Sequence, residues 1–338
     1  MSAMTRKPLK MISEDSRPVL IFLMLLVAIF VVFSFLHREF LSTRNISNLL
    51  KHASVSSMFA LGALFVVVVG HFDLSFHLVC SLSGMTTSFL IANNVPVLPS
   101  IAAGLAAGAV FGFCNGIAIG KMRLPDMVTT IATGAIAWGF AWIYSDGSYI
   151  WKNATTSGIL LLNDALIFGI PLPVILMLAM YFLANVVLHW SRFGRCFYST
   201  GENRVAAIFS GVRVRAYIIA AFMICAVLAS VGAIMGNASQ GSGSVRVGMV
   251  YLLPAYATIF LGSAIFKKPT VYGTFLAALF ISTMLNGFTL MAVPYYYSDF
   301  MIGLVLIVAL ALSSSMVVRT RFGTRRAGGG ESRKEVAQ

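Results

Sequence analysis

Few polar residues in this chain could bind a metal or catalyse a reaction, and three of them lie close together in the sequence. Two histidines, His71 and His77, flank Asp73. Imidazole and carboxylate groups together can ligate a transition metal. Three such residues close in sequence also occur in ordinary structured turns, so no metal site is predicted. Apolar runs of membrane-spanning length lie on both sides of the group, so any chemistry must be placed in or beside a membrane.

A phosphate-binding P-loop, which would let the chain hydrolyse ATP, is absent from the sequence. That motif needs a glycine, four residues and then Gly-Lys-Ser/Thr, because its amides and its lysine surround the phosphates. The pair Gly120-Lys121 is followed by Met122, and Asn115 stands where the first glycine would be. His-Glu-x-x-His, Gly-x-Ser-x-Gly and clustered Cys/His ligands are absent too. The chain is not expected to be an enzyme or to hold a cofactor.

Composition indicates that lipid covers most of this protein. The chain has 338 residues, of which 59% are hydrophobic and 10% charged, with a net charge of +13. Soluble domains carry about 25% charged residues, so these charges are too few to cover a surface in water. The basic residues lie between apolar runs and at the two ends, which is typical of a topology signal and not of a nucleic-acid interface.

Ten apolar segments are long enough for transmembrane helices, which need about 20 residues. The sequence therefore predicts an all-α membrane protein whose transmembrane domain covers residues 18–316. A cytoplasmic segment, 1–17, precedes it, and a basic tail, 317–338, follows and is expected to be disordered. The expected spans are about 18–36, 53–70, 77–93, 97–120, 126–145, 172–190, 215–235, 250–266, 270–292 and 297–316.

Lysine and arginine indicate the orientation of these spans. If the N-terminus is cytoplasmic and there are ten spans, 19 of the 24 Lys and Arg residues lie on the cytoplasmic side. Cytoplasmic loops carry such an excess, so both termini are predicted to be cytoplasmic. The weakest point is the stretch 70–78, which is short and nearly uncharged. It is predicted to be a broken or re-entrant helix, which membrane proteins tolerate where it is buried in protein.

A glycine at every fourth position marks the fourth expected span. Gly104, Gly108, Gly112, Gly116 and Gly120 share one face of a helix. Without side chains they let a neighbouring backbone approach closely. This favours tight helix packing, and sliding of helices during gating is the functional alternative.

The cytoplasmic loop 191–214 is predicted to contain a short helix. Glu202 and Asn203 can begin it, because both can satisfy amides at a helix N-terminus, and Gly211 can end it. A capped helix with a small-residue face suits docking into a partner's groove, whereas an ordinary structured loop is the alternative. The residues of this expected coupling site are Gly201, Glu202, Asn203, Ala206, Ala207, Ser210 and Gly211.

This loop resembles the coupling loop of ABC-importer permeases of the ribose/xylose/autoinducer-uptake (branched-chain amino acid/sugar permease) family. The shared pattern is Arg-x-Gly-Arg, then Gly-x-Asn-x-x-Ala-Ala-x-x-Ser-Gly-Val. Three other places are similar to family elements: Gly70–Ser75, Asn115-Gly116 with Lys121–Pro125, and Leu285–Phe288. The likeness runs from about 40 to 316. The sequence departs from the family at Phe76-His77 and at Ala264–Pro269. These departures concern the residues that would contact the substrate and the partner subunits.

The resemblance implies an importer built from several chains. This chain would be one of two permease subunits, in a homodimer or a heterodimer, carrying a sugar or sugar-like molecule across the bacterial inner membrane. A separate subunit with nucleotide-binding domains would bind ATP and Mg and hydrolyse the ATP. A periplasmic solute-binding protein would deliver the substrate, membrane lipid would surround the permease, and no nucleic acid is expected. The missing P-loop agrees with this division of labour.

Polar residues within the spans are the candidates for a substrate path, because they are costly in lipid and tend to face the protein interior. Asn and Gln suit a neutral polyhydroxyl ligand, since their amides both donate and accept hydrogen bonds. Helix–helix hydrogen bonding is the alternative for each, and Asp73 could instead cap the half-helix after it. The candidates are Asp73, Asn115, Asn237, Gln240 and Asn286, with Asp299 nearer a span end.

Two other classes of membrane protein remain as alternatives. A secondary carrier driven by an ion gradient usually places several carboxylates at mid-membrane, whereas Asp73 and Asp299 both lie near span ends. An integral-membrane enzyme needs a clustered catalytic group, which the sequence lacks. An ATP-driven importer is the leading interpretation, and an ion-driven carrier of a small polar solute is the alternative.

Overall fold

The computed structural model describes the backbone of residues 17–328 and the side chains of residues 19–311 other than Ile21. This part of the chain is built from helices, with one small β-hairpin, and it confirms the all-α prediction. Residues 1–16 and 329–338, which belong to the expected N-terminal segment and tail, lie outside the described residues.

The chain alternates long helices with mostly short connections. The longer helices are α1 (Arg17–Leu36), α2 (Thr43–Val68), α3 (Phe76–Ala92), α4 (Val97–Gly120), α5 (Asp126–Ser145), α7 (Leu172–Asn185), α8 (Arg192–Glu202), α10 (Val214–Gln240), α11 (Leu252–Phe266), α12 (Val271–Leu290) and α13 (Tyr295–Gly328). The shorter elements are η1 (Arg38–Leu41), α6 (Leu161–Asp164), β1 (Leu166–Ile167), β2 (Ile170–Pro171), η2 (Val186–Trp190), α9 (Arg204–Phe209) and η3 (Met249–Tyr251). Helix α13 includes the first part of the expected tail, 317–328.

Helix ends follow local sequence signals. Ser42 precedes α2, and its side chain accepts a hydrogen bond from the Asn45 amide. Thr270 precedes α12 and accepts in the same way from the Gly273 amide. These hydroxyls satisfy amides that have no partner within the helix. At the other end of a helix, Gly241 terminates α10 with a φ of +64°, a conformation that glycine adopts without strain.

Seven helices of the described residues are long and apolar enough to cross a membrane, and three shorter apolar helices lie at Phe22–Leu36, Phe76–Ala92 and Tyr295–Ala311. Each expected span coincides with one of these helices. The expected span 53–70 starts earlier than predicted, at Thr43, because the Ser42 cap begins the helix there. The described residues thus form a multi-pass membrane protein.

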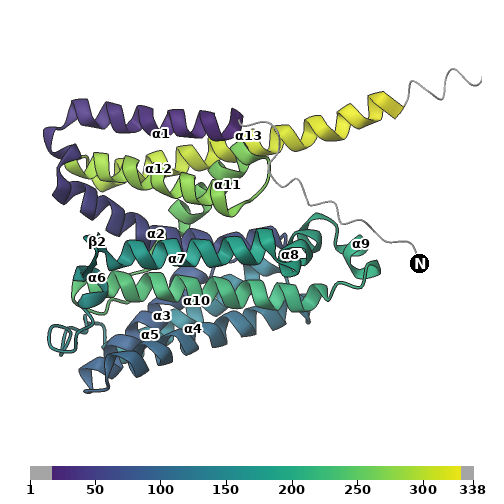
Figure 1. Ribbon diagram of the computed structural model, residues 1–338. Coiled ribbons are helices and arrows are strands. Elements are labelled where there is room, and N and C mark those ends of the chain that lie inside the picture. The colour runs from purple at the N-terminus through teal and green to yellow at the C-terminus, as the bar shows by residue number, and fades with distance from the viewer. Residues whose placement is uncertain (1–16, 329–338) are drawn as a thin grey trace, which may run out of the picture.

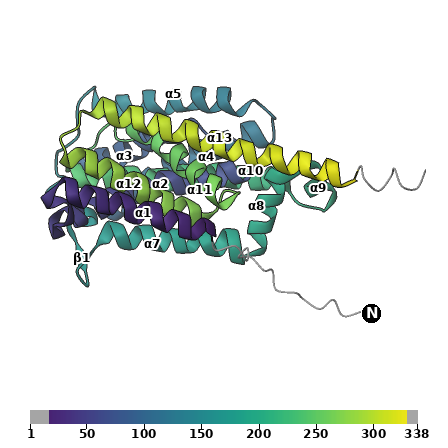
Figure 2. The same ribbon diagram turned by 90° about the horizontal axis from the view of Figure 1, so that it is seen from above.

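Two groups of helices share α2. In one group, α10 packs against α2, α3 and α4, and α5 packs on α3. In the other, α11 packs against α12 and α13, and α1 packs on α12. Helix α2 contacts α10 as well as α11 and α12, and Figure 1 shows it between the two groups. In the view of Figure 2, α5 and α7 lie on different sides of the molecule, while α8 and α9 lie together at one end.

The glycine stripe of α4 is buried against α10 and α3. A Cβ on Gly112 would lie 2.7 Å from the Phe222 carbonyl oxygen, and one on Gly116 would lie 2.6 Å from the Ile219 Cα. Real Cβ atoms do not approach so closely, so only glycine permits this helix spacing. The packing interpretation of the stripe is therefore confirmed.

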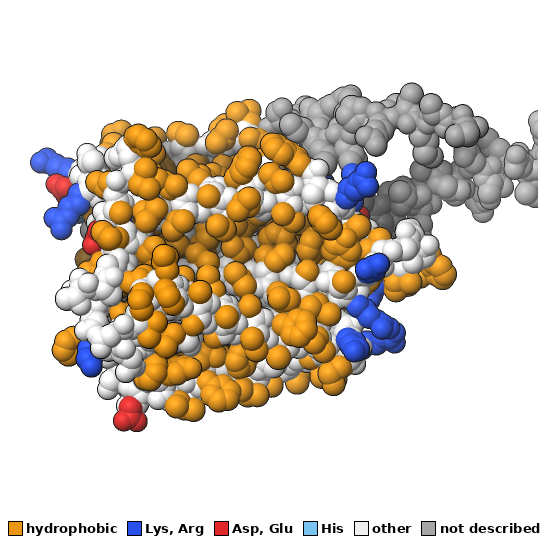
Figure 3. Space-filling view, turned by 60° about the horizontal axis from the view of Figure 1, so that its bottom comes forward, with side chains coloured by type: hydrophobic (Ala, Val, Ile, Leu, Met, Phe, Trp, Pro, Cys, Tyr) orange, Lys and Arg blue, Asp and Glu red, His pale blue; other side chains and the backbone are white. Residues whose placement is uncertain are grey.

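The surface has the pattern expected of a membrane protein. Figure 3 shows hydrophobic side chains across the middle of the visible face, with lysine and arginine side chains gathered toward its two ends. Exposed apolar residues such as Val128, Ile143 and Ile307, which are 68%, 73% and 66% exposed, lie along the spans. In a lipid bilayer such a band faces hydrocarbon.

Candidate functional site

The predicted break near 70–78 is present as the non-helical segment 69–75, between the end of α2 at Val68 and the start of α3 at Phe76. Its central residues are deeply buried: Asp73 and Ser75 are each 1% exposed. Unpaired backbone amides are costly away from water. The segment therefore needs a partner for each of its N–H groups.

Other parts of the protein supply those partners. The Phe72 amide donates to Asp126 Oδ2 at 3.0 Å, and the Leu74 amide donates to Thr130 Oγ1 at 3.0 Å. The Gly70 and His71 amides donate to carbonyls of the last turn of α2. Thus α5, through two side chains spaced four residues apart and so on one helix face, holds the break in place.

Tyr256 of α11, in the other helix group, also forms hydrogen bonds with the segment 69–75. Its hydroxyl accepts a hydrogen bond from the Asp73 amide at 2.9 Å and donates to the Asp73 carbonyl at 2.7 Å. The Asp73 carboxylate in turn accepts from the Ser75 amide at 2.7 Å. This last bond closes a turn within the segment and is not the capping role offered as an alternative for Asp73, because the residue that precedes α3 is Ser75 and the helix has no side-chain cap. The break is thus tied to both helix groups.

A chain of side-chain hydrogen bonds joins Asp73 to Asn115. Ser75 Oγ donates to Asp73 Oδ1 at 2.5 Å, and Asn115 Nδ2 donates to Ser75 Oγ at 2.8 Å. Thr133 Oγ1 of α5 donates to Asn115 Oδ1 at 2.6 Å. Two of the candidate path residues, far apart in sequence, therefore lie in one buried polar network among α3, α4 and α5.

His71 and His77 do not assemble a metal site with Asp73. His71 Nδ1 lies 3.2 Å from Asp126 Oδ2. Within the residues that the structure describes, no cluster of three His, Cys, Asp or Glu side chains could hold a metal ion. The compact group noticed in the sequence is thus divided: His71 contacts Asp126 of α5, and Asp73 binds Ser75 within the segment.

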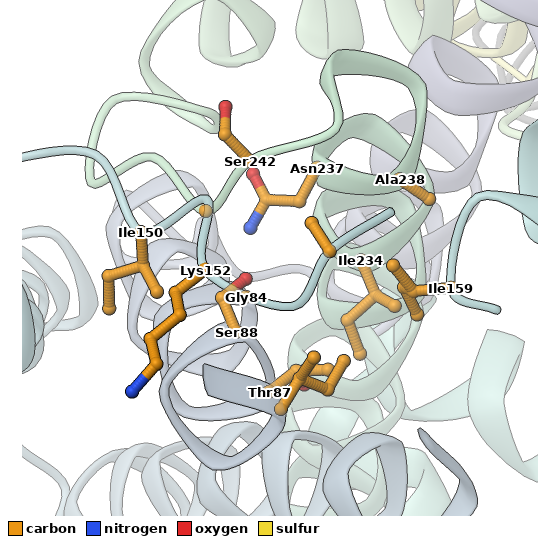
Figure 4. Close-up of a pocket in the computed structure, with 13 residues that line it drawn as sticks. Gly84, Thr87, Ser88, Ile150, Lys152, Ile159, Ile234, Asn237, Ala238 and Ser242 are labelled. Carbon is orange, nitrogen blue, oxygen red and sulfur yellow. The ribbon is translucent and has the colours of Figure 1, made fainter. Parts of the chain in front are cut away.

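Asn237 lies in a separate small cavity, about 20 Å³, beside the second half of α3. Figure 4 shows its amide among Gly84, Ser88 and Ser242. Its Oδ1 accepts from the Ser244 amide at 3.3 Å, while its buried Nδ2 has no hydrogen-bond partner. The cavity has room for about one water-sized group, which that free donor would bind.

The connection between α5 and α7 closes over this cavity. Ile150 and Gly243 exchange two backbone hydrogen bonds, of 3.1 and 2.7 Å. Asn153 Nδ2 donates to Asn94 Oδ1 at 3.0 Å and to the Ala92 carbonyl at 3.1 Å. The loop is therefore fastened both to the end of α3 and to the segment after α10, with Lys152 at the cavity wall.

The other candidate path residues lie elsewhere. Asn286 pairs reciprocally with Asn45 of α2, each amide nitrogen lying 3.0 Å from the other's oxygen. Gln240 and Asp299 are exposed. The structure does not gather the six candidates at one place, and Asn286 makes the helix–helix contact that was the alternative for it.

The loop 191–214, predicted to be cytoplasmic, forms two helices, α8 and α9. Asn203 lies between them, and its side chain accepts from the Ala206 amide at 3.0 Å, so it begins α9. Glu202 is instead the last residue of α8. Helix α9 ends at Phe209, and Gly211 follows with a φ of +78°. The short helix and its Asn203 cap are as expected, while the role of this loop in coupling stays a prediction.

Two residues of α9 were missed in the sequence. Val205 and Phe209 are 64% and 88% exposed, four residues apart on one helix face, whereas Ala207 is buried. An exposed apolar pair at this spacing is a typical anchor for a helix in a partner's groove. The i, i+4 spacing of Val205 and Phe209 is visible in the sequence. Whether that face of α9 is exposed or buried against the protein depends on tertiary packing.

These features define the class: a multi-pass helical membrane protein with a buried break among its spans and a helical loop at one end. The family described as "branched-chain amino acid transport system / permease component" matches residues 45–310. The chain belongs to this family. It is therefore a permease component of the bacterial inner membrane, and the resemblance found in its motifs is confirmed.

Curated relatives match along most of the chain. Ribose import permease protein RbsC of Bacillus subtilis (strain 168) is 30% identical over 293 residues, which are 86% of this chain and 91% of that protein. D-allose transport system permease protein AlsC of Escherichia coli (strain K12) is 29% identical over 85% of this chain and 89% of its own length. Autoinducer 2 import system permease protein LsrC of Escherichia coli O9:H4 (strain HS) is 26% identical, with coverages of 87% and 86%. No solved structure matches the chain.

Proposed function

We propose that this chain is the permease subunit of an ATP-binding-cassette importer that carries a sugar or sugar-like molecule into the cell. One observation carries this proposal: relatives named for ribose import and for D-allose transport align along 86% and 85% of the chain. ATP and Mg would be bound by a separate subunit, in agreement with the missing P-loop. A second permease subunit and a periplasmic binding protein would complete the importer.

In this proposal the chain has ten spans and two cytoplasmic termini. The ten apolar helices and the excess of Lys and Arg at one side support this topology. The loop that contains α8 and α9 then faces the cytoplasm, and the loop over the Asn237 cavity faces the periplasm.

The proposed substrate path uses the two polar sites along α3. The network of Asp73 and Asn115 lies just before the start of α3, at Ser75, and the Asn237 cavity lies beside the second half of α3. Amides and hydroxyls predominate at both, and these groups can donate and accept hydrogen bonds to sugar hydroxyls. Asn286 has a packing role with Asn45 in this proposal.

The proposed coupling route runs from α9 to the break. Val205 and Phe209 would enter a groove of the ATP-binding subunit, as an amphipathic helix does. Just before α9, Gly201 lies in backbone contact with Gly70, the second residue of the segment 69–75. Movement of the loop would therefore reach Asp73 through packed backbone.

Reconstituted transport tests the proposal. The chain, its ATP-binding subunit and its binding protein are placed in liposomes, and uptake of labelled ribose and D-allose is measured with and without ATP. We expect uptake that requires ATP and is unaffected by an uncoupler. Uptake that persists without ATP and stops with the uncoupler would instead establish the ion-driven carrier.

A further inference from the structure

A hollow of about 880 Å³ lies among α9 and the ends of α4 and α10. Its rim is basic: Arg123, Arg204, Arg213 and Arg215 all line it, and all four are exposed. Among the residues that the structure describes, none of the four lies within ion-pair distance of a carboxylate. The site therefore offers four unneutralised guanidinium groups, which bind phosphate and carboxylate oxygens well.

The inner wall of the hollow is apolar. Ile119 belongs to the last turn of α4, Ile219 lies in the second turn of α10, and Leu124 lies between α4 and α5. Arg123, Arg213 and Arg215 thus stand at the ends of spans, Arg204 stands on α9, and Ile119 and Ile219 stand inside the spans. This order, charge at the helix ends and hydrocarbon further in, matches the order of polar and apolar groups in a phospholipid.

The hollow and the proposed coupling face, which is formed by Val205 and Phe209, lie on different sides of α9. Arg204 and Ile208 of α9 line the hollow, whereas Val205 and Phe209 are turned outward, 64% and 88% exposed. One short helix therefore presents one face to the hollow and another to a partner. The hollow can be occupied while the ATP-binding subunit engages the outward face.

We propose that this hollow binds the phosphate headgroup of an anionic phospholipid from the cytoplasmic leaflet, with its acyl chains against the apolar wall. A basic pocket between helix ends on the cytoplasmic side is suited to anionic lipid headgroups. A free phosphate ion would use the arginines and leave the apolar wall without a ligand. The bound lipid links α9 to the ends of α4 and α10 and so holds the coupling loop in position.

Lipid retention by the purified full-length chain tests this site. The protein in a neutral detergent is titrated with phosphatidylglycerol or phosphatidylcholine, and bound lipid is counted by native mass spectrometry. The variant R204Q/R213Q removes two rim charges, and R192Q/R195Q removes two exposed charges from α8, outside the hollow. We expect R204Q/R213Q to weaken phosphatidylglycerol binding about thirtyfold, because each basic side chain near anionic lipid contributes about fivefold, and R192Q/R195Q to leave it unchanged.

A second variant keeps all the charges. Ala216 is exposed and lines the hollow, so A216F places a phenyl ring in it, narrows it and should also reduce retention of phosphatidylglycerol. An unfolding midpoint measured in phosphatidylcholine shows whether each variant is folded.

Four results would overturn the proposal. They are equal retention of both lipids, equal loss in R192Q/R195Q, displacement of the lipid by inorganic phosphate at a concentration matched to the headgroup, and displacement by the ATP-binding subunit. The third would make the hollow a free-anion site, and the fourth would assign it to the partner. The first three need neither transport nor the ATP-binding subunit, so they test the lipid site independently of the proposed function.

Discussion

Gly201, in the last turn of α8, lies against Gly70 at the end of α2, so that a Cβ on Gly201 would be 3.0 Å from the Gly70 nitrogen. It would also meet the Val68 carbonyl oxygen. Gly70 itself has a φ of +79°, which favours glycine. The loop that contains α8 and α9 is therefore in direct backbone contact with the buried break. The contact requires that Gly201 has no side chain, whereas Gly70 is favoured by its φ.

Gly201→Val should separate these two backbones. We expect the free energy of unfolding to fall by about 1–3 kcal/mol, as for other overpacked sites, and ATP-driven uptake to fall more than stability alone explains. Thermal unfolding in detergent and uptake in liposomes check the two effects. Gly139→Ala is the control, because nothing lies within 4 Å of its Cβ position. Equal behaviour of the two variants would remove the contact from the coupling route.

Tyr256→Phe should destabilise the break without changing side-chain volume much. The hydroxyl serves both the amide and the carbonyl of Asp73, and both backbone groups would be left buried without a partner. The expected cost is about 1–3 kcal/mol, measured as a lower unfolding midpoint. Tyr297→Phe, at a side chain that is 54% exposed, should have no effect. If the two variants unfold alike, the Tyr256 hydroxyl does not hold the segment.

The pair of Asn45 and Asn286 should show the behaviour of a helix–helix contact. Either single change to Leu leaves the other amide without this partner, at about 1–3 kcal/mol. The double change to Leu should cost less than the sum of the two single changes, but more than zero, because the Phe40 carbonyl loses the hydrogen bond that Asn45 Nδ2 donates to it at 2.8 Å. Unfolding measurements on all four proteins form the cycle. The double variant should also keep sugar uptake. Loss of uptake without loss of stability would indicate that Asn286 belongs to the substrate path.

Phe209 and Val205 should contribute to binding of the ATP-binding subunit. Changing both to Ser removes the exposed apolar pair of α9, and we expect co-purification with that subunit to weaken about tenfold or more, as for buried anchors at interfaces. Phe193→Ser on α8, where the side chain is 63% exposed, is the matched control. Unchanged co-purification of the α9 variant, with normal membrane insertion, would argue against the coupling assignment.

Asn237→Leu should impair uptake more than folding. The change removes the unpartnered Nδ2 donor from the cavity, and loss of one hydrogen bond to a substrate hydroxyl corresponds to about a tenfold fall in the specificity constant for uptake. It also removes the Oδ1 acceptor of the Ser244 amide, a bond of 3.3 Å, and unfolding in detergent measures that separate cost to stability. Ile159→Leu alters an apolar wall of the same cavity and should leave uptake near normal. A similar fall in both variants would indicate a packing role for the cavity.

Much of the architecture followed from local patterns. Apolar runs located the spans because lipid requires about 20 apolar residues, and the spacing of Gly104 to Gly120 indicated a close helix contact without naming its partner. Asn203 could be identified as a helix cap because capping depends on the nearest few residues. Glu202 was misplaced by one helix, since the boundary between α8 and α9 depends on where α8 packs.

The sequence by itself determined the membrane class, the family and the position of the break, because each depends on composition, periodicity or short motifs. Tertiary structure alone decided what the polar residues do. Asn115 joins Asp73 through Ser75, whereas Asn286 pairs with Asn45, 241 positions away. A buried amide takes its role from whichever donor or acceptor the fold places within about 3 Å, and no local pattern contains that distance.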